Sequence, residues 1–174
     1  MMTTTRRWLL CGVLTTGTAF AADPAFLSLK IGGKDVLGSS ARKGFENSIE
    51  CVLFRVGASA PAVSSGTTVT KPVLQPLVCR KLIDRASPAL MKALSTGAAV
   101  SLVVKATRPS AKDPAIMETL TFNGDLGKVI DLRQFVLPPG TIDDPTRGLP
   151  SEEVTFAVAS WSYTDPAGEV GAIP

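Results

Sequence analysis

Short β-type runs, separated by turn residues, constrain the fold of this chain more than any other feature. Residues 26–31 (FLSLKI) alternate between apolar and polar side chains, and residues 49–56 (IECVLFRV) are rich in strand-forming types. Similar runs follow at 73–78, 99–106, 117–122, 129–136 and 154–163. Such runs between clusters of Gly, Pro and Ser are typical of strands in all-β folds. The pattern predicts a mainly β protein, with about seven strands in a sandwich or barrel.

Two details inside these runs bear on the strand arrangement. Pro76 cannot donate a backbone hydrogen bond, so it predicts an edge position or a bulge for the run at 73–78. Asn123-Gly124-Asp125 places a turn signal between the runs at 117–122 and 129–136. The connecting segments are too short to be domain linkers. The 174 residues are 45% hydrophobic, enough for a core, so we expect a single domain at 22–174.

One short helix interrupts the strand pattern at residues 86–97 (ASPALMKALSTG). Ser87 can accept a hydrogen bond from the first-turn amides, Pro88 suits the first helical position, and Gly97 can end the helix in the left-handed conformation. The sequence predicts a helix at about 88–96, whose apolar stripe of Leu90, Met91 and Leu94 packs on the sheet.

The first 21 residues (MMTTTRRWLLCGVLTTGTAFA) are predicted to be a secretory signal peptide, cleaved after Ala21. Arg6 and Arg7 precede a short apolar run, and Ala19-Phe20-Ala21 fits the small-residue cleavage pattern. Sec and twin-arginine export both fit these residues. Cleavage would leave 16 of the 18 basic residues against 15 acidic ones. We therefore expect an exported protein near neutrality, without a stable membrane anchor.

Export changes the interpretation of the two remaining cysteines, Cys51 and Cys79. An oxidising compartment permits a disulfide, whereas the plain alternative is two small buried hydrophobic side chains. If residues 57–70 connect an antiparallel pair, positions whose numbers sum to about 130 lie opposite one another. Cys51 and Cys79 meet that condition, so a disulfide between them is predicted.

The side chains that catalysis and metal binding need are mostly absent. The chain contains no histidine, which removes the commonest general base and most zinc sites. Ser40 and Lys43 match the Ser-x-x-Lys spacing of some hydrolases, but without the other elements of that site. The acidic pairs Asp143-Asp144 and Glu152-Glu153 are best interpreted as solvated charges. The sequence predicts neither enzyme activity nor a cofactor, and the lack of a basic stripe argues against a nucleic-acid partner.

Four segments, in order along the chain, resemble one known family. The central one is KLIDRASPALMKALSTG, residues 81–97, with Ile83, Asp84, Ser87, Pro88 and Gly97 as its motif residues. Two others are KGFENSIECVLF at 43–54 and KPVLQPL at 71–77. The last, residues 154–166, carries Phe156, Trp161 and Tyr163. Together these segments are similar to the haemolysin-coregulated protein (Hcp) family, the tube proteins of type VI secretion.

The resemblance implies a β-barrel of two sheets with one short helix packed against it. It also implies hexameric rings that stack into a tube and carry effector proteins. The leading hypothesis is thus a ring-forming structural protein of type VI secretion. The alternative is an exported monomeric β-barrel that binds partners without a tube role, and a hydrolase based on Ser40 and Lys43 is the third reading.

Overall fold

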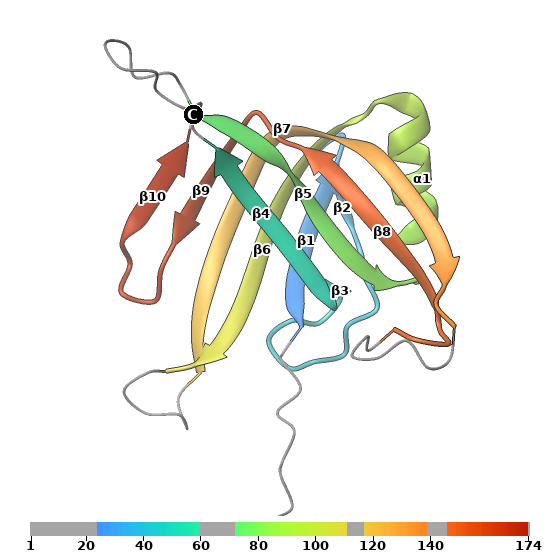
Figure 1. Cartoon of the computed structure of the whole chain (residues 1–174), viewed down its shortest axis with the longest axis horizontal. Coiled ribbons are helices and arrows are strands. Elements are labelled where there is room, and N and C mark those ends of the chain that lie inside the picture. The colour runs from blue at the N-terminus through green and yellow to red at the C-terminus, as the bar shows by residue number, and fades with distance from the viewer. Residues whose placement is uncertain (1–23, 60–71, 111–116, 139–145, 174) are drawn as a thin grey trace, which may run out of the picture.

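The computed structural model describes residues 24–59, 72–110, 117–138 and 146–173. The predicted signal peptide lies outside these residues. The described residues form ten strands and one helix (Figure 1). These are β1 (Ala25–Ile31), β2 (Lys34–Val36), β3 (Ile49–Cys51), β4 (Leu53–Ser59), β5 (Val73–Leu82), α1 (Ser87–Thr96), β6 (Ala99–Pro109), β7 (Met117–Val136), β8 (Pro150–Ala157), β9 (Ser160–Thr164) and β10 (Val170–Ile173).

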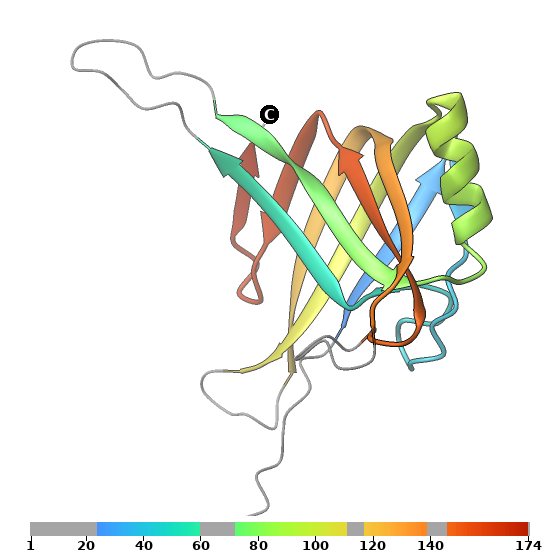
Figure 2. The same ribbon diagram turned by 45° about the vertical axis from the view of Figure 1, so that its right-hand side comes forward.

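The strands form one antiparallel sheet that curls round on itself (Figure 2). Its main order is β2-β1-β6-β7-β8-β5-β4, with β3 paired to β1, β9 to β7, and β10 to β9. β3 continues directly into β4 through Val52, so the chain itself links the two ends of the sheet. There the Val52 N–H donates a hydrogen bond to the Arg80 carbonyl at 2.8 Å. We call the junction of residues 51–52 with residues 79–80 the seam of the barrel.

The predicted mainly β fold with one helix is confirmed, but several predicted strands have different limits. The run at 49–56 is two strands, because the chain bends at Val52: β3 pairs with β1, while β4 pairs with β5. The run at 154–163 is also divided, into β8 and β9. β2 and β10 were not predicted.

β7 corrects the prediction of separate strands at 117–122 and 129–136. It is one 20-residue strand that continues through Asn123-Gly124-Asp125. Its first part pairs with β6 and β9, and from Lys128 onward it pairs with β8. A Cβ atom added to Gly124 would lie 3.1 Å from Leu102 Cδ1. One added to Gly127 would lie 3.0 Å from Val100 Cγ2. Gly124, which suggested a turn, and Gly127 therefore both permit close packing inside a bulged strand.

Pro76 lies in the kind of position that the sequence predicted, an edge or a bulge. β5 pairs with β8 only from Leu77 onward, so Pro76 is on a part of β5 that has a partner on one side only. The register between β4 and β5 also shifts next to it, between Arg55 and Gly57. Pro76 is thus both at an edge and beside a bulge, the two positions that a residue without an N–H tolerates.

The helix begins one residue earlier than predicted, at Ser87, and Gly97 ends it as predicted in the left-handed conformation with φ 63°. Leu90 is buried and Leu94 half-buried, but Met91 is exposed, so the predicted stripe packs through two of its three members. α1 lies against β7 (Figures 1 and 2), whose pairing with β6 ends at Lys128.

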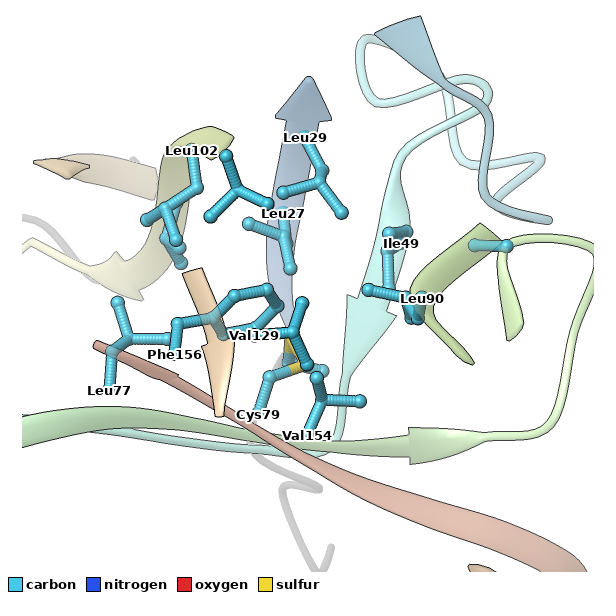
Figure 3. Packing of buried hydrophobic residues seen from close by; sticks show 14 of the residues in the cluster. Leu27, Leu29, Ile49, Leu77, Cys79, Leu90, Leu102, Val129, Val154 and Phe156 are labelled. Atoms are coloured by element: carbon cyan, nitrogen blue, oxygen red, sulfur yellow. A yellow bond between two sulfur atoms is a disulfide. The ribbon is translucent and has the colours of Figure 1, made fainter. Parts of the chain in front are cut away.

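The hydrophobic core fills the inside of the curled sheet (Figure 3). Alternate residues of β1, β5, β6 and β8 point inward, as the period-two pattern requires. Buried members from these strands, β3, β7 and α1 include Leu27, Leu29, Ile49, Leu77, Leu90, Leu102, Val104, Val129, Val154 and Phe156. Each such side chain contributes about 1.5–3 kcal/mol by leaving water. The core fixes which side chains face inward and which remain on the outer surface.

Candidate functional site

A buried polar cluster occupies the place where β5, β8 and the start of α1 meet. The Lys81 ammonium lies 2.7 Å from Asp84 Oδ1 and 2.8 Å from Glu152 Oε1, and it donates to the Leu82 carbonyl at 2.9 Å. The Ser87 hydroxyl donates to Glu152 Oε1 at 2.7 Å. Lys81 is 1% exposed and Glu152 fully buried. The motif residues Asp84 and Ser87 thus belong to one ionic network.

Ser87 does not act as the predicted cap of the helix. Its Oγ accepts a hydrogen bond from the Asp84 N–H at 3.0 Å, and Ala86 is the N-cap residue. Asp84 instead binds the chain just before the helix, because its Oδ1 accepts from the Ala86 N–H at 2.9 Å. Glu152, which interacts with Ser87, is 65 residues further along the chain. Local spacing could not have indicated this partner.

The cluster is a structural element rather than a catalytic one. Lys81 and Ser87 lie 3.3 Å apart, a spacing that a serine nucleophile and a lysine base could share. Both side chains are buried, however, and each is held by groups of the fold itself. A buried ion pair with its hydrogen bonds satisfied becomes strongly destabilising when one partner is removed, at about 3–5 kcal/mol. The arrangement therefore joins β5, β8 and α1.

Cys51 and Cys79 form a disulfide at the seam, with Cα atoms 5.4 Å apart. Both cysteines are buried. The register used to predict this pair is nevertheless wrong, because Cys79 lies opposite Phe54 in the β4–β5 ladder. Cys51 is on β3, opposite Ala25 of β1. The bend at Val52 places Cys51 next to β5. The disulfide therefore joins β3 and β5, two strands that do not pair with each other in the sheet.

The motif residues near the end of the chain belong to the core and to an aromatic cluster. Phe156 is fully buried. The Phe122 ring lies 5.1 Å from Tyr163, 5.3 Å from Phe54 and 6.4 Å from Trp161, measured between centroids. The buried Trp161 Nε1 has no hydrogen-bond partner among the described residues. These contacts join β4, β7 and β9 by packing.

Two motif residues do not enter the polar cluster. Ile83 is exposed, and its N–H donates to the Pro150 carbonyl at 3.0 Å. Pro88 lies in the first turn of α1 and is also exposed. The positions of Ile83 and Pro88 in the motif therefore correspond to the way the backbone enters the helix. Gly97 likewise fixes the path out of it.

An open groove lies on the outer face of β4, β5, β8 and β7, with a volume of about 750 Å³. We call it the outer groove; it is lined by Arg55, Val56, Gly57, Gln75, Pro76, Val78, Ile130, Asp131, Arg133, Glu153 and Thr155. No local sequence pattern by itself indicates this groove, because its lining residues come from four strands. The one local signal is Ile130, an apolar side chain that a bulge between Val129 and Asp131 leaves exposed.

Charges in and beside the outer groove are mostly paired. Arg80 Nη2 is 3.1 Å from Glu153 Oε2, and Arg133 Nε is 2.8 Å from Asp131 Oδ2. Arg80 also stacks over the Phe135 ring at 5.5 Å. Arg55 makes no ion pair or side-chain hydrogen bond with any described residue. Among the described residues, Arg55 is therefore the arginine of the groove lining that has no ionic partner.

The described residues that were considered for catalysis or cation binding are exposed or bonded to other groups. Ser40 Oγ accepts from the Arg42 N–H at 3.2 Å, while Lys43 is exposed. Glu152 is paired with Lys81 and Glu153 with Arg80, whereas Asp143 and Asp144 lie outside the described residues. No group of three metal-ligating side chains occurs in the part of the chain that the structure describes. Within the same residues, no helix has the length and apolarity to span a membrane.

The described residues thus form a β-barrel from one curled sheet, with one helix packed against it and an internal ion-pair network. A sequence model of the family described as "Type VI secretion system effector, Hcp" matches residues 28–162. The chain therefore belongs to the Hcp family, as the four sequence segments suggested. No curated protein matches the chain in sequence.

Solved structures show the same fold. Hcp1 from the E. coli EAEC 042 pathovar is 22% identical, with a TM-score of 0.71 over 87% of this chain and 97% of that one. Secreted protein Hcp3 from Pseudomonas aeruginosa is 20% identical, with a TM-score of 0.67 and the same two coverages. Hcp1 from Salmonella typhimurium is also 20% identical, with a TM-score of 0.62 over 86% and 92%. At these identities the likeness concerns the fold.

Proposed function

We propose that this protein is a building block of a type VI secretion tube, and that its subunits close into hexameric rings that stack and carry effector proteins. The observation that carries the proposal is the family match, which covers residues 28–162 and therefore nearly the whole barrel. In this role the protein acts by assembly, without a cofactor and without catalysis of its own.

Surface features of the barrel support assembly. Within the described part of the sheet, β4 is a terminal strand and β10 pairs only with β9, so each has one edge without a partner strand there. Exposed apolar side chains accompany these elements, including Leu53 on β4 and Val170 on β10. Free strand edges and exposed apolar groups usually mark surfaces that bind another chain. Different surfaces on one subunit produce a ring when the rotation between copies closes.

Size-exclusion chromatography with light scattering tests the ring directly. We expect a mass of six subunits, and negative-stain images should show closed rings with a central opening. A strict monomer at high protein concentration would overturn the ring and favour the alternative, a monomeric binding barrel. Co-purification of effector proteins with rings, but not with a ring-deficient variant, tests the carrier role.

We further propose that residues 1–21 are removed during export and that the domain at 22–174 is the mature protein. Ala19-Phe20-Ala21 after the apolar run supports this cleavage position. Mass spectrometry of protein from the cell envelope should find Ala22 as the first residue. Envelope protein that retains Arg6 and Arg7 would contradict the cleavage.

A further inference from the structure

We propose that the outer groove binds a second copy of this chain, and that the acidic turn at residues 165–169, between β9 and β10, is the segment that enters it. The inference rests on the proposed ring and names the contact that would hold neighbouring subunits together. It follows from the charges and shapes of two surfaces on the same barrel.

The outer groove offers one free positive charge beside an apolar floor. Asp131 and Glu153 neutralise Arg133 and Arg80, which leaves Arg55 for an anionic partner. Val78 forms a nearly buried floor, while Ile130 remains 48% exposed at the side. A carboxylate next to an apolar side chain would complement this surface, because it would pair Arg55 and cover Ile130.

The acidic turn presents that combination in a preformed shape. The Asp165 N–H donates to the Glu169 carbonyl at 3.0 Å. Asp165 Oδ1 accepts from the N–H groups of Ala167 at 2.9 Å and Glu169 at 2.8 Å. Gly168 supplies the positive φ of 88° that such a turn requires. A turn already closed by its own hydrogen bonds loses little conformational entropy when it binds.

Charge and apolar exposure at the acidic turn match the outer groove. Asp165 and Glu169 are two acids, and residues 161–173 contain no lysine or arginine. The Glu169 carboxylate has no partner among the described residues, since only its backbone groups are bonded. The next residue, Val170, is 66% exposed. In the proposed contact Glu169 pairs with Arg55, and Val170 packs on Ile130.

The two surfaces belong to different parts of the subunit. The outer groove is on β4, β5, β8 and β7, whereas the acidic turn projects from the β9–β10 hairpin on the side away from α1 (Figure 1). A contact between unlike surfaces of identical chains is heterologous, so every subunit donates one turn and receives another. This geometry repeats around a ring without leaving any groove empty. Opposite charges on the two surfaces also select the correct orientation during encounter.

A charge swap tests the contact. The variants are Arg55→Glu, Glu169→Arg and the double variant with both changes. Two controls carry the same charge changes outside both surfaces, Lys92→Glu on α1 and Glu50→Arg on β3, where both side chains are exposed. Light scattering over a dilution series gives the concentration at which each ring dissociates. Thermal melting in parallel verifies that every variant folds.

We expect each single variant at the contact to raise the dissociation concentration on the order of tenfold or more, the range in which interfacial charge pairs couple. The double variant should recover most of this loss, and both controls should behave as the wild type.

Three results would overturn the inference. If Arg55→Glu and Glu169→Arg form rings as stable as those of the controls, the contact is wrong while the proposed ring stands. If both single variants weaken the ring but the swap restores nothing, the outer groove receives another segment. If the wild-type protein is monomeric at every concentration, the proposed function fails and the contact fails with it.

Discussion

Reduction of the Cys51–Cys79 disulfide should lower the stability of the barrel by about 3.6 kcal/mol. The two cysteines are 28 residues apart in sequence. In the chain-entropy treatment, a loop of that length removes about 12 cal/mol/K from the unfolded chain, which is about 3.6 kcal/mol at 25 °C. Both thiols remain in the reduced protein, so the expected loss comes from the broken covalent link rather than from a cavity.

Urea unfolding with and without a dithiol reductant measures this loss. With a slope of about 2 kcal/mol/M, typical of small proteins, the midpoint should fall by about 1.8 M on reduction. The protein concentration must be kept fixed, because the proposed ring would make the stability concentration-dependent. The variant Cys51→Ala/Cys79→Ala serves as the control, since its midpoint should not respond to the reductant. A wild-type midpoint that moves no more than the control's would refute the reasoning.

Three further substitutions test other parts of the structure. Lys81→Met removes the cation that pairs with both the Asp84 and the Glu152 carboxylates, so urea unfolding should show a loss of about 3–5 kcal/mol, against almost none for Lys92→Met. Gly97→Ala places a side chain at φ 63°, and unfolding followed by circular dichroism should show a cost of about 1–2 kcal/mol; an unchanged midpoint would contradict the cap. Gly38→Ala would put a Cβ atom only 2.2 Å from the Ser48 carbonyl oxygen, so limited proteolysis should cut the 37–48 segment faster than in Gly171→Ala, whose Cβ meets nothing within 4 Å.

Local sequence patterns predicted the kind of fold because the signals they use are local. Alternation of apolar residues identified β1, a strand-forming run located most of β6, and Gly97 marked the end of α1. Pro76 indicated an edge or a bulge because a missing N–H has the same effect in any sheet. These properties depend on a residue and its nearest neighbours, so one sequence is enough to find them.

Features that depend on distant partners were beyond the sequence. Gly124 resembled a turn residue, yet Leu102 on the neighbouring strand uses the space that its missing side chain leaves. Ser87 resembled a helix cap, but its Oγ accepts from the Asp84 N–H outside the helix and its hydroxyl donates to Glu152 on β8. The outer groove could not be predicted for the same reason, because residues from four strands and a bulge form it. In each position a tertiary contact overrode the local preference.

The sheet order also determines when each strand can find its partner. β6 and β7 are neighbours in the chain, as are β4 and β5, so each of these pairs joins strands that are close in sequence. By contrast, Phe26 of β1 pairs with Lys105 of β6, and Leu77 of β5 with Phe156 of β8, both 79 residues later. Pairings of such separation slow folding. A chain made from its N-terminus must therefore hold β1 and β5 without these partners until most of it exists. In that interval the segment from β1 to β5 is most open to aggregation.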